Sequence, residues 1–427
     1  MMRFCFLTAA LAALTLAAAA QPAAPADPAP ALLAPPAAAP PLAVRPLGVA
    51  KTSKFGQIGN LTLLPIPVIF YQDETGFGYG LGALLSGRFS ADTLTRPSNA
   101  RVQYWTTQKG QSLLQLVHSI YTPGEKFYLN GEVSAYDLAL YYYGIGNENS
   151  KSAESDLQYK LFIINQRVQK QVLPKLFFGA QYRLTNMSQI TFEPGRIDQA
   201  KQPNSPELVP STFRTDPRLT PRERQDTRVS GLGPVLTYDT RDVPLAAFRG
   251  DLLDFGVTFN GTGLGSDYRF VRYQLDARHF QPLGSNRTIL ALQYLAQLHT
   301  GDVPFRELAG LGANLGGTLY NNANLLRGIY EQRYRDRQMM MFQAEIRQKL
   351  FPNAGSSVLR RFDAAVFGGI GQTGAKVGDF TGKGTLVAGG GGIRFNFLQA
   401  DRVNLRLDYA GGTGTAPGIY FAIGEAF

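Results

Sequence analysis

The chain has 427 residues, of which 44% are hydrophobic, with 46 glycines, 20 tyrosines, 27 phenylalanines and a formal net charge of +10. Beyond the N-terminal region no stretch approaches about eighteen uninterrupted apolar residues, which excludes later transmembrane helices. The cations are spaced singly rather than in runs, so the charge fits solvated surfaces and no nucleic-acid partner is expected.

The first 55 residues contain two segments that cannot form a core. Residues 1–20 combine an early cation, Arg3, with an apolar run and small residues at its end, which predicts a secretory signal peptide removed after Ala20. A retained anchor helix is the alternative. Removal would also take away Cys5, the sole cysteine, and leave no disulfide and no cysteine metal site. Residues 21–55 are rich in proline and alanine and predict an extended periplasmic tether.

From residue 56 to residue 427 the sequence reads as short strands separated by turns. Sixteen strands are predicted, near residues 64–71, 76–88, 100–108, 111–121, 126–139, 156–169, 175–190, 228–238, 251–261, 267–281, 287–299, 338–351, 359–373, 384–397, 402–411 and 418–427. An even number returns both ends of an up-and-down barrel to one side, as bacterial outer-membrane barrels require.

The strand predicted at 338–351 shows why a membrane barrel is favoured. Phe342, Ala344 and Ile346 fall on one face, whereas Glu345 and Arg347 fall on the other. A period of two indicates a strand. When many strands repeat it, the apolar face can meet lipid and the charged face can line a wet lumen. The fold class predicted is therefore all-β, a 16-stranded antiparallel transmembrane β-barrel.

The first strand and the long connections have distinct features. Pro65 and Pro67 each lack an N–H donor, so the first strand is predicted to pair poorly along one edge. With a periplasmic N-terminus, the long connections at 140–155, 191–227 and 300–337 would lie outside the cell, and the short turns inside.

Three motifs stand out against this barrel. The first, predicted to form a periplasmic turn after the eighth strand, consists of Tyr238, Asp239, Arg241, Asp242 and Gly250. The second is Arg327 and Gly328, followed by Tyr330, between the eleventh and twelfth strands. The third is the C-terminal stretch, in which Phe421, Ile423 and Phe427 are predicted to share one face of the last strand.

Together these motifs resemble the BamA/TamA family of outer-membrane barrels, also called the bacterial surface antigen family. The resemblance implies a loop folded into the lumen between strands 11 and 12 and anchored by Arg327, with Tyr330 in the aromatic role although Ile329 follows the glycine. It also implies that the C-terminal stretch is an assembly signal. The sequence departs from the family at Glu425, where an apolar or aromatic residue is usual, and residues 21–55 have no room for the periplasmic POTRA modules of large members.

The function implied by the resemblance is the insertion, assembly or translocation of envelope proteins or lipids through an openable seam between the first and sixteenth strands. The partners implied are outer-membrane lipid, the barrel-assembly machinery for the chain's own insertion, and client envelope proteins. The location implied is the outer membrane of a Gram-negative cell. No cofactor is expected.

The lumen-facing acids suggest how the loop is held. A guanidinium inside a barrel cannot become neutral by losing its proton, so it needs carboxylate partners. Glu345 and Asp408 lie on inward positions of their strands and are the expected partners of Arg327. Arg333 and Arg337, farther from the turn, are expected to matter less. A solvated loop arginine is the alternative.

Two other classes of protein are alternatives to an assembly or translocation barrel. A barrel hydrolase would need a base beside a nucleophile, but His118, His279 and His299 lie on separate strands and no Gly-x-Ser-x-Gly elbow occurs. No catalytic or metal-binding residue is predicted. The glycine-rich segment 369–374 matches a dinucleotide pattern, yet no helix follows it. A passive porin-like or structural barrel remains open, because sixteen strands can enclose a channel.

Overall fold

The computed structural model describes residues 57–58, 61–72, 76–89, 95–147, 155–192, 212–312, 325–399 and 402–427. The predicted signal peptide and the whole of the predicted tether, residues 1–55, lie outside the described residues, and all that follows concerns the chain from Gln57 onward.

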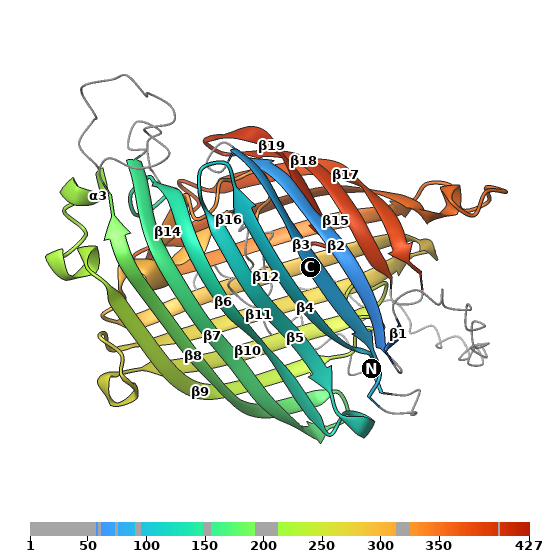
Figure 1. Cartoon of the computed structure of the whole chain (residues 1–427), viewed down its shortest axis with the longest axis horizontal. Coiled ribbons are helices and arrows are strands. Elements are labelled where there is room, and N and C mark those ends of the chain that lie inside the picture. Colours follow the sequence, from blue (N-terminus) through green and yellow to red (C-terminus); the bar gives the residue numbers. More distant parts are fainter. Residues whose placement is uncertain are drawn as a thin grey trace, which may run out of the picture. The chain divides into compact units, whose positions relative to one another are not determined.

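Within the described residues, sixteen long strands form one antiparallel sheet, which confirms the predicted fold class. Figure 1 shows how these strands lie side by side. They are β2 (Leu61–Gln72), β3 (Gly76–Gly87), β4 (Ser98–Thr107), β5 (Ser112–Tyr121), β6 (Phe127–Tyr142), β7 (Ser155–Leu173), β8 (Leu176–Thr191), β9 (Thr227–Asp239), β10 (Gly250–Asn260), β11 (Phe270–Leu283), β12 (Ser285–Gly301), β15 (Gln338–Lys349), β16 (Phe362–Gly374), β17 (Leu386–Leu398), β18 (Val403–Gly412) and β19 (Thr415–Ile423).

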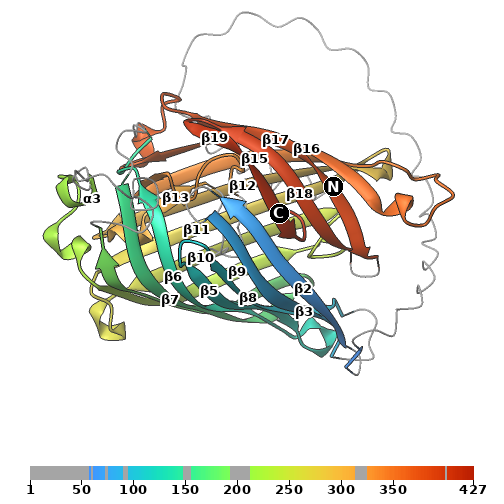
Figure 2. The same ribbon diagram turned by 45° about the horizontal axis from the view of Figure 1, so that its top comes forward.

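Each long strand pairs with the next along the chain, and β12 pairs with β15 across the longest connection. The sheet curls until its first strands, drawn in blue, face its last, drawn in red (Figures 1 and 2). At this junction β19 and β2 approach each other, but no paired register joins them within the described residues. We call this junction the seam.

The two faces of the sheet have the character expected from the alternating sequence. In β15, Phe342 and Ile346 are 43% and 47% exposed, whereas Gln343, Glu345 and Arg347 between and beside them are buried. The same alternation recurs in β10, β11 and β18. The apolar belt thus faces outward, and the polar side chains face the lumen.

The connection between β12 and β15 fills part of that lumen. It contains the 3-10 helix η5 (Phe305–Glu307) and a small sheet in which β13 (Ala309–Leu311) pairs with β14 (Tyr334–Asp336). Residues 303–312 and 325–329 are all buried. Arg306 stacks near Tyr159 of β7 while Leu326 packs against Gly369 of β16, so side chains of the connection touch distant parts of the wall.

The remaining helices are short and lie in connections. They are η1 (Pro123–Glu125), α3 (Thr212–Thr215), η3 (Pro221–Arg224), η4 (Thr262–Leu264), η6 (Leu359–Arg361) and η7 (Val377–Asp379). Among the described residues, none of the helices has the length and apolar character needed to cross a bilayer.

The ends of the sheet differ from the prediction. A two-residue strand, β1 (Gln57–Ile58), pairs with the start of β2 and was not predicted. The last strand runs from Thr415 to Ile423 instead of 418–427, because Gly424 adopts a left-handed φ of 86° and turns the chain out of the strand direction.

Candidate functional site

The tip of the lumen connection is held by charged side chains from the wall. Arg327 is 1% exposed and pairs with Glu345 of β15 through Nη2 and with Asp408 of β18 through Nη1. Its guanidinium also lies over the ring of Phe367 in β16, 3.4 Å from the ring centre. One loop residue therefore contacts three strands of the wall.

Further arginines share these two acids. Arg394 of β17 pairs with Asp408 and lies 3.3 Å from Glu345, and Arg347 donates to Glu345 at 2.7 Å. Arg406 lies 3.4 Å from Asp408. Glu425 adds a third acid, 3.3 Å from Arg394 and 3.6 Å from Arg347. We call this set of four arginines and three acids the lumen network.

Gly328 explains why a glycine follows the anchoring arginine. Its φ is 110°, and a Cβ there would stand 2.4 Å from the carbonyl oxygen of Gly411 in β18. Its N–H donates to the Tyr420 hydroxyl at 3.1 Å. A side chain at this position would push the loop tip off the wall.

The residues after Gly328 complete the packing. Ile329 is fully buried in an apolar cluster with Leu325 and Leu326. Tyr330 packs against the cluster that includes Tyr141 of β6 and Tyr143, the residue that follows this strand. The aromatic role that the resemblance implied for Tyr330 stays a prediction, but the side chain lies among aromatic rings.

A second anchor was not predicted from the sequence. Glu307 of η5 is 3% exposed and pairs with Arg183 of β8 at 3.2 Å and Arg272 of β11 at 3.1 Å. Both arginines occupy inward positions of their strands. The alternation showed that they face the lumen, but a lone acid in a long connection gave no signal of its partner.

The C-terminal residues turn into the lumen. Phe421 is 42% exposed on the outer face of β19, yet Phe427 is 6% exposed and packs with Phe280 of β11. The backbone oxygen of Phe427 accepts from Arg347 at 3.0 Å. The expectation that Phe427 shares a face of the last strand with Phe421 and Ile423 is therefore wrong, because the turn at Gly424 comes between them.

A family model for the Omp85 superfamily domain matches residues 100–427, which is more than half of the chain. The chain belongs to the Omp85 superfamily. The recognised resemblance is therefore confirmed, and the protein is a barrel of the bacterial outer membrane and not an enzyme. No curated protein sequence matches it closely enough to count as a relative.

Solved structures of other proteins resemble this Omp85 barrel at low sequence identity. CdiB from Escherichia coli is 11% identical, with a TM-score of 0.51 over 85% of this chain and 62% of that chain. BamA from Haemophilus ducreyi lacking POTRA domains 1-3 is 13% identical, with a TM-score of 0.49 over 86% and 70%. This Omp85 chain therefore spans less than two thirds of that CdiB chain.

The turn between β9 and β10 of this Omp85 barrel forms ion pairs with residues of other turns. Asp239 pairs with Arg241 at 3.0 Å and with Arg96 at 2.7 Å, and Asp242 pairs with Arg402 of the turn before β18. Gly250 has a φ of 101°, and a Cβ there would meet the carbonyl oxygen of Thr240 at 2.3 Å. The motif thus holds the turns at one end of the barrel together through ion pairs, and no described contact gives it a chemical role.

Tyr238, the first residue of the motif, differs from these ion-paired residues in its exposure. Tyr238 is 40% exposed on the outer face of β9. In the neighbouring turn, burial acts most strongly on Glu125 and opposes its ionisation, but hydrogen bonds from Arg96 and Lys175 outweigh it and hold the pKa of that carboxyl below its ordinary value. Arg96 therefore links the motif's Asp239 to the turn at η1.

Proposed function

We propose that this Omp85 barrel inserts or translocates envelope proteins or lipids by opening the seam between β2 and β19. The observation that carries the proposal is that every other neighbouring pair of long strands has a paired register, whereas the described residues show none at the seam. An unpaired strand edge can accept an added strand or separate at little cost in hydrogen bonds.

The prolines of β2 lie on the edge that faces the seam. An antiparallel strand donates to a given neighbour from every second residue. The β2–β3 register runs unbroken across Pro65 and Pro67, which have no N–H, so the donors toward β3 must come from the residues between and beside them, such as Leu64 and Val68. The seam edge of β2 therefore lacks two donors.

The edge of β19 that faces the seam can donate hydrogen bonds to β2, but Pro65 and Pro67 of β2 cannot donate in return. Gly424 donates to the carbonyl oxygen of Asn404 in line with the β18–β19 register, so even-numbered residues face β18. The N–H groups of Ile419, Phe421 and Ile423 consequently face the seam. Closure in register would leave the β19 carbonyl oxygens opposite Pro65 and Pro67 without an N–H donor, which favours a weak seam.

The lumen connection supports the same mechanism from the other side of the barrel. Arg327 and Glu307 fix it to β15, β18, β8 and β11, and none of these strands is β2 or β3. The anchored connection thus stiffens the wall away from β2 and β3, so that opening is concentrated where pairing is weakest.

Depletion and complementation test the proposed function. Depleting the protein is expected to change the outer-membrane proteome or lipid composition, and the wild-type chain should restore it. A chain locked by a Leu64→Cys/Ile423→Cys disulfide should fail, because Leu64 and Ile423 pack on the same apolar cluster at the seam.

The matched control is a lock inside the continuous sheet. Ala135 of β6 and Phe162 of β7 are directly paired and both exposed, so an Ala135→Cys/Phe162→Cys disulfide should leave complementation intact. Full complementation by the seam-locked chain would rule out opening as the mechanism.

A passive pore is the second candidate function, since the lumen is lined by polar side chains. The buried connection and the lumen network occupy space that an ion path would need. Purified protein in planar bilayers is expected to show little steady conductance. A large, stable conductance would favour the pore.

A further inference from the structure

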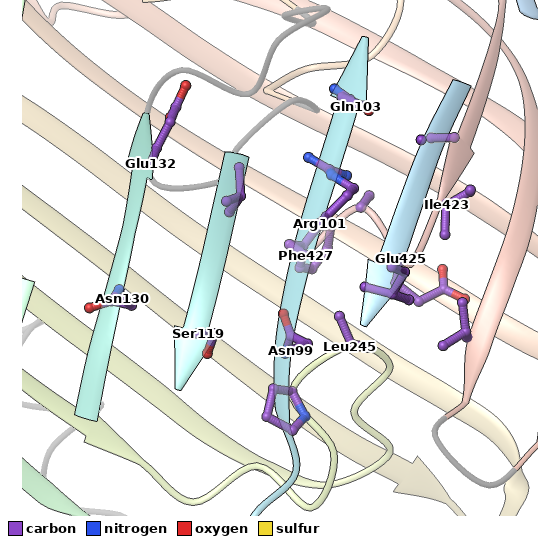
Figure 3. Close-up of a pocket in the computed structure, with 18 of the residues that line it drawn as sticks. Asn99, Arg101, Gln103, Ser119, Asn130, Glu132, Leu245, Ile423, Glu425 and Phe427 are labelled. Carbon is purple, nitrogen blue, oxygen red and sulfur yellow. The ribbon is translucent and has the colours of Figure 1, made fainter. Parts of the chain in front are cut away.

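The lumen contains a cavity of about 350 Å³ in the half nearer the short turns. Figure 3 shows polar residues from neighbouring strands around it, among them Arg101 on β4, Ser119 on β5 and Glu132 on β6. The C-terminal residues Glu425 and Phe427 lie on another side of the same space.

Most charged side chains around the cavity already have ion partners. Arg167 pairs with Asp254, and Arg278 with Asp276. In the same way, Arg241 pairs with Asp239 and Glu425 with Arg394. These groups are neutralised in place and offer little to a charged ligand.

Arg101 and Glu132 are the exceptions within the described part of the chain. Glu132 is 3% exposed and accepts hydrogen bonds from Ser134 at 2.5 Å and Gln115 at 3.1 Å, but no cation lies within ion-pair distance. Arg101 donates to Gln115 at 3.3 Å, its Nε has no hydrogen-bond partner, and no acid lies within ion-pair distance. The two lone charges are opposite in sign.

The register places these two charges on one row of the wall. Arg101 is directly opposite Val117, and Val117 is directly opposite Glu132. Neighbouring strands are about 4.8 Å apart, so the two backbones are separated by roughly 10 Å. Gln115 hydrogen-bonds to both side chains and holds them toward the same space. A ligand that bridges them needs an anion and a cation a short distance apart.

A neighbouring side of the cavity, separated from β4 by β3 alone, is apolar and reaches the seam. Val68 and Ile69 of β2 and Phe421 and Ile423 of β19 line it, and Ile69 and Phe421 are 54% and 42% exposed toward the outside. The cavity therefore joins a polar lumen wall to the apolar belt at the junction that has no paired register.

We propose that this cavity binds the headgroup of a zwitterionic phospholipid, with the phosphate on Arg101, the ammonium on Glu132 and the acyl chains leaving between β2 and β19. A phosphate and an ammonium joined by a short ethanolamine link satisfy both lone charges at once. The volume lies at the low end for a small-molecule site and suits a headgroup better than a client strand. Headgroup binding requires only the two lone charges and the apolar lining at the seam, and it does not depend on the insertion of client proteins.

Native mass spectrometry of the full purified protein tests the site. The probes are phosphatidylethanolamine and phosphatidylglycerol with identical acyl chains, which share the phosphate but differ in the ammonium. The wild type should retain the ethanolamine lipid about tenfold better, the difference expected for one charge-assisted contact. Glu132→Gln should abolish this preference, and Arg101→Gln should weaken the binding of both lipids.

Two charge controls lie on exposed positions away from the cavity. Lys170→Gln and Asp302→Asn remove one charge each and should leave lipid retention and preference unchanged. Each variant is checked for heat-modifiable migration, so that loss of binding is not loss of fold. Equal retention of the two lipids by the wild type, or a preserved preference in Glu132→Gln, would overturn the proposal.

The result is independent of the proposed function. A chain that complements depletion but shows no lipid preference would refute the headgroup site alone. A chain that prefers the ethanolamine lipid yet complements fully when seam-locked would refute seam opening alone.

Discussion

Arg327 illustrates what a charge costs and contributes inside this barrel. Its guanidinium is almost fully buried and cannot be neutralised, so its contribution depends on Glu345 and Asp408 remaining beside it. The lumen network shares each of these acids among several arginines. Loss of one arginine weakens the screening of the repulsion between the acids. Loss of one acid leaves several arginines without one of their ion partners.

Arg327→Ala is expected to release the loop tip. Removal of one partner from a buried ion pair typically costs ~3 to 5 kcal/mol, so the connection should become sensitive to protease in folded, membrane-embedded protein. Arg327→Lys should rescue only in part, since a point charge cannot reach both acids as a fork does. Arg337→Ala, at an exposed position, is the control.

The outcome that contradicts the anchor is equal protease sensitivity in Arg327→Ala and Arg337→Ala. Arg333 is not a suitable control, and the expectation that it matters little is not supported by its surroundings. It is 2% exposed and stacks over Tyr143, 4.2 Å from the ring centre.

Gly328→Ala tests the close approach of the loop to β18. The substitution combines a left-handed backbone, which costs ~1 to 2 kcal/mol for a residue with a Cβ, with a clash against the Gly411 carbonyl. We expect a lowered midpoint of thermal unfolding, read as loss of heat-modifiable migration. Gly355→Ala has open space around its Cβ and should be silent. Equal midpoints for both variants would refute the tight fit.

For individual residues, the sequence predicted which side chains face the lumen but only some of their ion-pair partners. Alternation placed Glu345 and Asp408 inward, and the arginine motif placed Arg327 in the loop. The contributions of Arg394 and Glu307 depend on pairs that are far apart in the chain and are fixed by the curvature of the sheet, which a period of two does not encode.

The elements at the two ends of the sheet carry the most irregular geometry. Periodicity predicted the interior strands to within a few residues, because every position there is either lipid-facing or lumen-facing. It failed at β1, which is too short to show a period, and after Ile423, where Gly424 ends the strand. The prediction that Phe427 shares a face with Phe421 extended the period of two past Gly424, the residue that ends the strand.

Deleting Phe427 is expected to leave the chain in the periplasm and sensitive to protease. If the residue is an assembly signal, the deletion should still refold in detergent, with a lowered unfolding midpoint because the contact with Phe280 is lost. Phe351→Ala, an exposed aromatic in a turn, is the control for loss of a ring. Normal membrane assembly of the deletion would contradict the signal.

The turn at η1 predicts a pH effect outside the membrane-spanning strands. The folded pKa of Glu125 is depressed by Arg96 and Lys175, so its contribution to stability is fully present above the unfolded pKa and is lost as pH falls through the folded pKa. Arg96→Gln should therefore lower the unfolding midpoint at neutral pH and lower it less in acid. A loss independent of pH would show that the packing of Arg96 over Tyr121 dominates.

The whole barrel combines one weak junction with an anchored interior. The paired registers run from β2 to β19, the connection between β12 and β15 is tied to the wall at two places, and the short turns are braced by ion pairs. Seam opening therefore requires no disruption of the lumen network that holds the loop. Membership in the Omp85 superfamily shows the fold, and the proposed movement is a separation of β2 from β19 at the seam.

Distances across the seam test this account most directly. Spin labels at Leu81 of β3 and Tyr409 of β18 span three inter-strand steps that include the seam, and labels at Leu116 of β5 and Phe178 of β8 span three steps of continuous sheet. All four positions are exposed, and the lone native cysteine, Cys5, lies in the predicted signal peptide.

Pulsed electron paramagnetic resonance in lipid bilayers should give a narrow distribution for the control pair, near the roughly 25 Å that three strand spacings across the sheet and an offset of about six residues along it produce. The pair across the seam should give a broader distribution with a longer component, and the Leu64→Cys/Ile423→Cys disulfide should remove that component. Two distributions of equal width, unchanged by the disulfide, would contradict an opening seam.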